Sequence, residues 1–359
     1  MNTEKKNQHY IPKFYLRNFS YEGNNKQIGV FNLDNQKFCQ TGKLKTQGSK
    51  NFFYGADGIV EDRLSNIEGH LASILKGIIN SKNLPAKGSK EHIDLLAFVG
   101  ITNLRNPVLI ENLKQSREAM RTRLLELQPD ADVDKLAPKL EHEKAIQLAL
   151  SGLSPILKTT TDLDYKLLIN KTAKPFIGSD FPVVRYNQFL EGKEWEYGRE
   201  GYGCVGLQIF IPLNHEITLM FYDPMVYKVG FRKRSEHELI DVEDVYQLNI
   251  LQMVNCFGTI YFNENGDEHY IREIYSRSLR FKRSNKITSS LHYIEKEGKN
   301  GTIINSEKEK NMIMIGSTDN EIKLNINGVK IHSRGSNIKL GDSVAALRPL
   351  ATEIMRNNR

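Results

Sequence analysis

QHYIPKFYLRNF, residues 8–19, is the stretch on which most expectations for this chain rest. It sets one histidine, His9, and one arginine, Arg17, among aromatic and aliphatic residues of the kind that folded proteins bury. A buried charged or titratable side chain is costly unless it finds a partner. We therefore expect His9 and Arg17 to be buried, either in a hydrogen-bonded structural cluster or as one wall of a functional site.

Three further polar residues stand beside apolar segments. Glu68 lies, together with Glu61, along the edge of a helix-spaced apolar stripe over residues 60–78. Arg105 ends a second apolar helix, where it either complements the helix dipole or pairs with Asp180 or Glu68. Asp180 stands at the end of a predicted strand, a position where catalytic or metal-binding carboxylates and simple Asx-turns both occur.

The five residues have a shared chemical interpretation if they converge in space. An imidazole from His9 and two carboxylates, from Glu68 and Asp180, would form a site for a hard metal such as Mg²⁺ or Mn²⁺. Arg17 and Arg105 would then neutralise charge on phosphate oxygens during hydrolysis of a phosphodiester. Alternatively each residue is structural, with His9 as a hydrogen-bonded core histidine and the arginines in buried ion pairs.

A basic cluster provides the second functional signal. The formal net charge is +7, from 50 basic and 43 acidic residues, so the excess is mild over the whole chain. Between residues 271 and 286 it is concentrated, with one acid, Glu273, and with Tyr275 and Phe281 interleaved; the bases are Arg272, Arg277, Arg280, Lys282, Arg283 and Lys286. This pattern predicts either a surface that contacts nucleic-acid phosphates or a solvated basic face.

The periodicities predict an α+β fold in which a helical block packs on a mainly antiparallel sheet. Helices are expected over residues 60–78, 89–104, 110–127, 138–150 and 242–254, with Ser89 as an N-cap. Strands are expected over residues 27–32, 37–39, 165–170, 175–179, 208–212, 217–222, 226–230 and 258–263. Six of these strands are expected to form hairpins in consecutive pairs, 27–32 with 37–39, 165–170 with 175–179 and 208–212 with 217–222.

The chain is expected to divide into a main domain over residues 1–285 and a small β-rich appendage over residues 286–359. The appendage is rich in Asn, Ser and Gly, and the turn Asn327-Gly328 predicts a hairpin between residues 323–326 and 329–332.

Several classes of protein are disfavoured. The sequence has no Walker loop, zinc-protease motif, nucleophile elbow or dinucleotide-binding glycine fingerprint. Its three cysteines, Cys39, Cys204 and Cys256, are widely spaced and odd in number, as expected for reduced thiols. With apolar runs far too short for a membrane span and no signal-peptide pattern, we expect a cytoplasmic protein with no membrane span.

Three motifs carry a resemblance to a known family. They are His9 to Pro12 with Tyr15 to Phe19, then Arg105-Asn106-Pro107, and then Ser179-Asp180-Phe181-Pro182, where Phe181 replaces the usual Asn. Over about residues 5–265 the chain resembles the bacterial domain of unknown function 4238 family, DUF4238. The resemblance implies a link to antiphage defence, because some relatives look like components of defence systems.

Two hypotheses follow. The first is an intracellular defence-type effector that acts on nucleic acid, as a metal-dependent nuclease or phosphodiesterase, alone or with a partner defence protein. The second is a non-catalytic module that binds nucleic acid or protein and whose polar residues only fix the fold. The first requires His9, Glu68 and Asp180 around a solvent-connected cleft, and the second requires them sealed and paired. A third possibility, a small-molecule hydrolase or transferase that uses the same cleft, requires a deep pocket with no basic surface leading to it.

Overall fold

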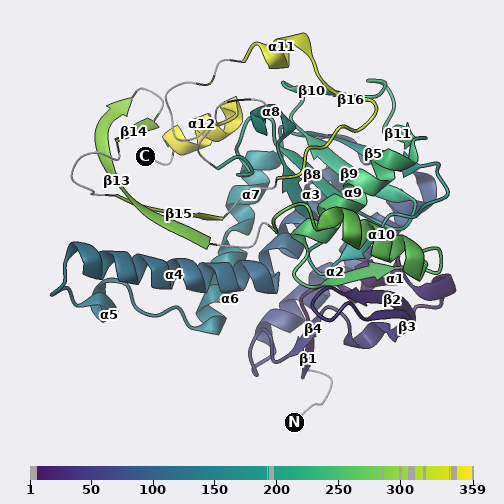
Figure 1. Ribbon diagram of the computed structural model, residues 1–359, viewed down its shortest axis with the longest axis horizontal. Helices are drawn as coiled ribbons and strands as arrows, with labels where there is room; N and C mark the ends of the chain where they lie inside the picture. The colour runs from purple at the N-terminus through teal and green to yellow at the C-terminus, as the bar shows by residue number, and fades with distance from the viewer. Residues whose placement is uncertain are drawn as a thin grey trace.

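The computed structural model describes residues 6–191, 193, 198–283, 287–298, 301–305, 312–317, 321–338, 340 and 346–357 (Figure 1). The helices are α1 (Lys13–Arg17), α2 (Ile59–Ser81), α3 (Lys90–Leu104), α4 (Pro107–Leu127), α5 (Val133–Leu136), α6 (His142–Ser151), α7 (Leu153–Thr160), α8 (Gln188–Glu191), α9 (Val242–Asn255), α10 (Glu268–Ser278), α11 (Ser333–Ser336) and α12 (Pro349–Asn357). Two short 3-10 helices span Tyr21–Gly23 and Leu44–Thr46.

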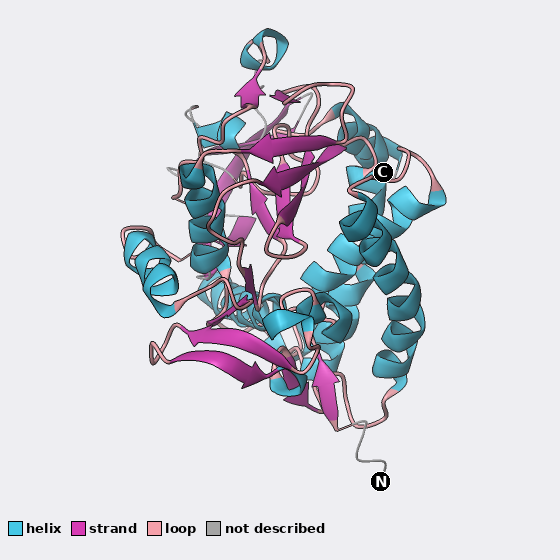
Figure 2. Cartoon of the chain, turned by 90° about the vertical axis from the view of Figure 1, so that its right-hand side faces the viewer, coloured by secondary structure: helices cyan, strands magenta, loops and turns pink. Residues whose placement is uncertain are grey.

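The strands are β1 (Asn7–His9), β2 (Gln27–Asn32), β3 (Phe38–Lys43), β4 (Ser49–Asn51), β5 (Asp164–Asn170), β6 (Gly178–Ser179), β7 (Val184–Tyr186), β8 (Gln208–Pro212), β9 (Ile217–Tyr222), β10 (Tyr227–Val229), β11 (Glu236–Leu239), β12 (Thr259–Phe262), β13 (Ile287–Gly298), β14 (Gly301–Asn305), β15 (Met312–Ser317) and β16 (Val329–Ile331). A five-stranded sheet has the order β11-β5-β9-β8-β7, and a four-stranded sheet has the order β3-β2-β12-β6. Figure 2 shows the two sheets one above the other, with helices on both sides. Among the described strands of these sheets only β5 and β11 pair in parallel, which confirms the α+β class with mainly antiparallel sheets.

The opening segment lies in the core that joins helices and sheets. Tyr15, Leu16 and Phe19 are fully buried, and the Tyr15 hydroxyl donates a 2.7 Å hydrogen bond to the carbonyl of Pro212 at the end of β8. His9 is also buried, at the end of β1, where it pairs with Ser49 of β4. The expected burial of this stretch is therefore confirmed for its apolar residues and for His9.

The expected burial of Arg17 is wrong, because its side chain is exposed to solvent. Helix α1 is a single amphipathic turn that buries Tyr15 and Leu16, so the positions four residues apart, Lys13 and Arg17, share the outer face. The apolar composition of the stretch hid this helical periodicity. Arg17 therefore needs no buried partner.

The helical block forms where the apolar stripes predict it. Helix α2 buries Leu64, Leu71, Leu75 and Ile78 on one face. The Ser89 hydroxyl caps α3 by accepting a 3.2 Å hydrogen bond from the backbone N–H of His92, as expected. The chain then bends, because Asn106 and Pro107 begin a new helix directly after α3.

Two of the expected hairpins, 165–170 with 175–179 and 323–326 with 329–332, are wrong in their pairing. Strand β5 pairs with β9 and β11 in the five-stranded sheet, whereas β6 pairs with β12 in the other sheet. The segment between β5 and β6 thus connects two sheets. The Asn327-Gly328 turn is present, but β16 pairs with β10 and the residues before the turn form no strand.

Part of the C-terminal region belongs to the main core. Ile322, Leu324 and Ile326 are buried in a hydrophobic cluster that also contains residues of the five-stranded and four-stranded sheets. Arg348 is fully buried as well. The Arg348 guanidinium pairs with Asp162 at 2.9 Å and donates to carbonyls including that of Cys204, at 2.7 Å. Strands β13, β14 and β15 form a separate three-stranded sheet. For these three strands, the domain boundary expected near residue 285 remains a prediction. The described residues from Ile322 to Ala346 contribute side chains to the main core.

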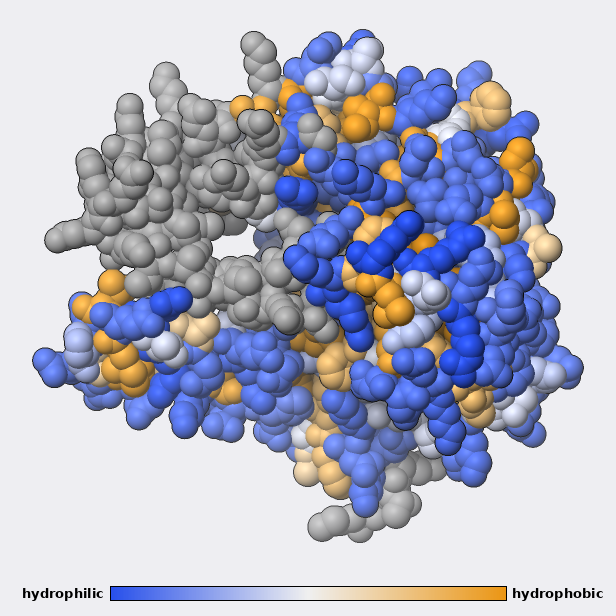
Figure 3. Space-filling view, in the orientation of Figure 1, coloured by the Kyte–Doolittle hydropathy of each residue, from blue (hydrophilic) through white to orange (hydrophobic). Residues whose placement is uncertain are grey.

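Helices α4 and α5 project from the body as an arm (Figure 1). Figure 3 shows hydrophobic residues gathered at its free end, where Leu125, Leu127 and Leu136 are exposed. The candidate site lies at the opposite end of α4, where the helix begins beside α2 and α3.

Candidate functional site

Arg105 is the centre of a buried polar cluster at the end of α3. Only 1% of its side chain is exposed, and its Nη1 atom lies 2.7 Å from the Glu68 Oε1 atom on α2. The guanidinium is also hydrogen-bonded to the Tyr54 hydroxyl. Burial lowers the pKa of Arg105, but Tyr54 and Glu68 outweigh it and raise the pKa above its ordinary value. Of the alternatives that the sequence left open for Arg105, the structure shows the pairing with Glu68.

Tyr54 connects this cluster to the opening segment. Its hydroxyl donates a 3.0 Å hydrogen bond to the carbonyl of His9. The buried Gln8 side chain holds the same loop, because its oxygen accepts from the Tyr54 N–H at 2.6 Å and its amide donates to the Gly55 carbonyl at 2.8 Å. Sequence reasoning overlooked Gln8 and Tyr54, although Gln8 stands in the opening motif.

His9 is held neutral at this position. Burial, followed by the nearby cations Lys13 and Arg105, lowers its pKa from 6.5 to about 4. Its Nε2 atom is buried and has no hydrogen-bond partner within the described residues. A neutral imidazole is the form that binds metals, but it is also the form that simple burial imposes.

The lowered pKa of His9 predicts a specific acid sensitivity. An unfolded histidine binds its proton near pH 6.5 and the folded one only near pH 4, so this stability is present above pH 6.5 and is lost as pH falls toward 4. The shift corresponds to about 3 kcal/mol of unfolding free energy. In urea unfolding, we expect the unfolding free energy of His9→Gln to fall less steeply than that of the wild type between pH 6.5 and 4. The same substitution at the exposed His269, His269→Gln, should follow the wild type. Parallel curves for His9→Gln and the wild type would contradict this role.

Glu61 adds a second carboxylate to the cluster. It precedes Glu68 by seven residues and lies on the same edge of α2. Burial, followed by the charge of Glu68, raises the pKa of Glu61. Arg105 and Lys13 oppose that rise. The aligned pair expected from the sequence is thus partly buried and shares the positive charge of Arg105.

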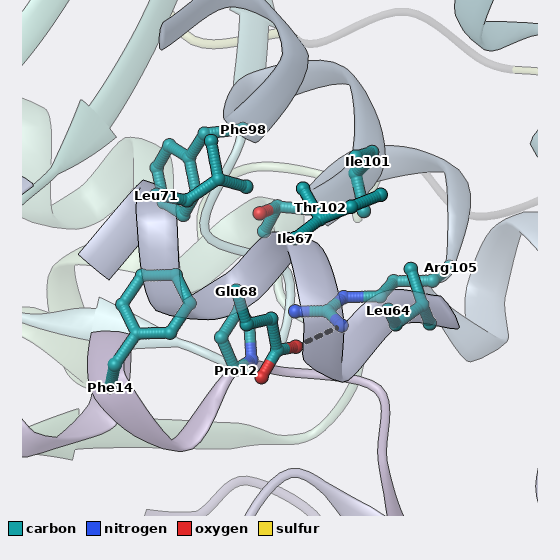
Figure 4. Close-up of a pocket in the computed structure, with 10 residues that line it drawn as sticks. All are labelled: Pro12, Phe14, Leu64, Ile67, Glu68, Leu71, Phe98, Ile101, Thr102 and Arg105. Atoms are coloured by element: carbon teal, nitrogen blue, oxygen red, sulfur yellow. Dashed lines mark hydrogen bonds and ion pairs between the residues drawn. The ribbon is translucent and has the colours of Figure 1, made fainter. Parts of the chain in front are cut away.

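A shallow pocket opens beside the cluster (Figure 4). It encloses only about 10 Å³, and its walls are Pro12, Phe14, Leu64, Ile67, Glu68, Leu71, Phe98, Ile101, Thr102 and Arg105. Figure 4 shows Glu68 and Arg105 meeting at one side, with Phe14, Leu71 and Phe98 at another. Small-molecule sites usually enclose about 300 to 1,000 Å³, so this mainly apolar pocket is too small for a nucleotide.

Asp180 lies in a different polar cluster. Its side chain is 2% exposed, and its two carboxylate oxygens accept hydrogen bonds from three consecutive backbone N–H groups: Phe257 at 2.6 Å, Gly258 at 2.9 Å and Thr259 at 2.8 Å. Burial raises the pKa of Asp180 to about 6, and these N–H groups oppose the rise. The carboxylate therefore fixes the loop that leads from α9 into β12.

The Arg105-Asn106-Pro107 motif joins the two clusters. Arg105 binds Glu68, while the Asn106 side chain donates a 2.6 Å hydrogen bond to the carbonyl of Asp180. The Asn106 oxygen also caps α4 by accepting from the Val108 N–H at 2.9 Å, and Pro107 occupies the first turn of that helix. Each residue of the motif thus has a structural task.

The predicted metal ligands do not form a ligand set in the described part of the chain. No group of three or more His, Cys, Asp or Glu side chains there is arranged to hold a metal ion. Glu68 is engaged by Arg105, and Asp180 is engaged by backbone N–H groups. The involvement of Mg²⁺ or Mn²⁺ stays a prediction.

The basic cluster begins on α10 and continues after it, and its described bases are largely neutralised within the molecule, while Lys286 lies outside the described residues. Arg272 lies 2.7 Å from Glu268, and Arg277 lies 2.9 Å from both Glu243 and Glu273. These pairs are exposed, so each contributes little to stability and remains open to competition from phosphate.

The remaining three described bases of the cluster differ from one another. Lys282 pairs with Glu321 at 3.3 Å, and Arg280 stacks over the ring of Phe281 at 4.8 Å. Arg283 donates a 2.6 Å hydrogen bond to the carbonyl of Phe257 and so holds the loop that surrounds Asp180. Arg283 is therefore a structural residue, and the sequence did not distinguish it from its neighbours.

Comparison with known proteins identifies the family of the chain. A family model described as protein of unknown function (DUF4238) matches residues 7–266, and the chain belongs to that family. The matched region includes both polar clusters, whereas Arg283 and the C-terminal residues lie beyond it. No curated protein matches the chain, and no solved structure matches it.

Within the described ranges, no single helix is long and apolar enough to cross a membrane, although α3 and α4 together have that length and composition across a 58° bend.

Proposed function

We propose that this protein is an intracellular, non-catalytic module that binds nucleic acid and whose buried polar clusters hold its fold. The observation that carries the non-catalytic part is the environment of Asp180, which is sealed below three backbone N–H groups. A general base or metal ligand needs free oxygen lone pairs that reach the substrate or the ion. The pairing of Glu68 with Arg105 removes a second candidate in the same way.

The charge distribution supports nucleic acid as the partner. The net charge is +7, and aromatic residues stand among the exposed cations, as in surfaces that contact phosphates and stack on bases. The antiphage setting and a partner defence protein rest on the family resemblance. The cytoplasmic location is part of the same proposal.

A metal-dependent nuclease is the second candidate, and one observation favours it. Glu61 and Glu68 lie on the same edge of α2, and burial followed by the charge of Glu68 raises the pKa of Glu61. Two nearby carboxylates supply the oxygen ligands that Mg²⁺ or Mn²⁺ prefers. This candidate requires Arg105 to release Glu68 when the metal binds.

Binding of labelled single-stranded oligonucleotides tests the proposal. We expect the purified full chain to bind 20-nucleotide DNA and RNA at 50 mM salt, with affinity that falls linearly on logarithmic axes as salt rises, since phosphate contacts release counterions. Fluorescence anisotropy measures this directly. Absence of binding at 50 mM salt would contradict the nucleic-acid part of the proposal.

A further inference from the structure

A second basic surface is assembled from segments far apart in the sequence. Strands β10 and β16 pair antiparallel, and their register places Lys228 directly opposite Lys330. Both side chains are exposed, so two like charges stand side by side on the outer face of this ribbon. Like charges in directly opposed positions destabilise a strand pair. Figure 1 shows the ribbon of β10 and β16 apart from α10 and its basic cluster.

The loop after β10 extends this surface. Phe231, Arg232, Lys233 and Arg234 are all exposed, and 74% of Phe231 is accessible to solvent. The Arg234 guanidinium lies over the Phe231 ring at 5.6 Å from its centroid. We name Lys228, Phe231, Arg232, Lys233, Arg234 and Lys330 the ribbon patch.

The loop is held in place although its side chains are free. The buried amine of Lys166 on β5 donates to the backbone carbonyls of Phe231, at 2.6 Å, and Arg234, at 2.5 Å. At the start of the loop, the Gly230 N–H donates to the Gly328 carbonyl at 2.9 Å. A loop anchored in this way presents its side chains at fixed positions, which reduces the entropy lost on binding.

The cations of the ribbon patch lack acidic partners of the kind that neutralise the basic cluster on and after α10. Within the described ranges, no carboxylate lies at ion-pair distance from Lys228, Lys330 or the three bases of the loop. The local sequence agrees, since residues 224–235 and 322–338 contain no Asp or Glu. Five unneutralised cations around one exposed aromatic ring form a surface complementary to an anionic polymer.

We infer that the ribbon patch is the main contact surface for single-stranded nucleic acid, with Phe231 stacking on a base and the cations binding phosphates. This inference rests on the proposed nucleic-acid binding and names the surface that carries it. Single strands suit the patch because their bases are free to stack on an exposed ring. The cluster predicted from the sequence is then secondary, since its arginines already have partners.

Matched charge reversals test the inference by anisotropy at 100 mM salt, each on the full chain. Lys228→Glu with Lys330→Glu is expected to weaken oligonucleotide binding at least tenfold and to reduce the salt slope by about 1.4, for two lost phosphate contacts on a single strand. The control, Arg272→Glu with Arg280→Glu, changes the net charge equally and is expected to weaken binding less than threefold. Phe231→Ala is expected to weaken binding at least fivefold.

The single variant Lys228→Glu separates binding from folding. Opposite Lys330 it creates a cross-strand ion pair, so its melting temperature should equal or exceed that of the wild type while binding weakens. If the double variant Lys228→Glu with Lys330→Glu does not fold, the neutral double variant Lys228→Gln with Lys330→Gln takes its place.

Each remaining outcome contradicts the inference. If the wild type and the ribbon-patch variants bind the oligonucleotide equally well, the inference about the ribbon patch is wrong but the proposed function is not contradicted. A wild type that binds no oligonucleotide overturns both. Loss of binding to phosphatidylserine vesicles in the ribbon variants, with oligonucleotide binding unchanged, assigns the patch to an anionic membrane.

Discussion

Asp180→Asn is expected to lower the unfolding free energy by at least about 3 kcal/mol at pH 7.5. Both carboxylate oxygens accept backbone N–H groups, from Phe257, Gly258 and Thr259, and an amide has only one oxygen. Its NH₂ group would therefore face N–H donors at a buried position where water cannot replace the lost acceptor. Chemical denaturation followed by tryptophan fluorescence or circular dichroism measures the loss.

Asp130→Asn is the matched control, because Asp130 is exposed in the connection between α4 and α5. The control should unfold within about 0.5 kcal/mol of the wild type. Equal stability of Asp180→Asn and the wild type would show that the three N–H groups do not depend on the charge of Asp180.

Glu68→Gln is expected to cost about 3 kcal/mol of unfolding free energy, because it leaves the Arg105 charge buried without its counter-charge. Arg105 is 1% exposed, the Tyr54 hydroxyl that remains hydrogen-bonded to it is uncharged, and Glu61 interacts with it only through its charge. Removal of a carboxylate from a buried pair therefore has a larger effect than its removal from a surface pair.

The Arg272 and Glu268 pair provides an internal comparison at the same N–O distance, 2.7 Å, but with both side chains exposed. Glu268→Gln should change the unfolding free energy by less than about 1 kcal/mol. Similar losses for Glu68→Gln and Glu268→Gln would indicate that Arg105 gains access to water when its partner is removed.

Local periodicity accounts for the elements that the sequence predicted well. The stripe over residues 60–78 matches α2, and the helix over 242–254 matches α9, because each buries one face of a single continuous segment. The hairpin of β8 and β9 was also predicted, since its turn and both strands are adjacent in the sequence.

Strand pairing between distant segments was not predictable in the same way. Strand β5 pairs with β9 and β11, and β16 pairs with β10, in preference to the neighbours that their turns suggested. An apolar strand indicates that it will be buried but not which edge it joins. The ribbon patch escaped notice for this reason, because Lys228 and Lys330 become neighbours only through that pairing.

The candidate site was predicted in part. Side-chain reasoning gave Arg105 either an interaction with the helix dipole or a partner, Asp180 or Glu68, and the structure shows the pair with Glu68. It could not identify the partners of Asp180, because these are backbone N–H groups of residues 257–259 that leave no side-chain pattern. Arg17 was misplaced because its helical position, four residues after Lys13, directs it outward.

The most direct test of the central claim is an incubation of full-length protein with labelled single-stranded DNA and RNA in the presence of Mg²⁺ or Mn²⁺. Wild type, Asp180→Asn and Glu68→Gln are compared at a temperature where all three are folded, with binding and cleavage read from the same reaction. If the polar clusters only hold the fold, each folded protein binds the oligonucleotide and leaves it intact. Cleavage by the wild type that is lost in folded Asp180→Asn, with binding retained, would contradict the account and assign chemistry to Asp180.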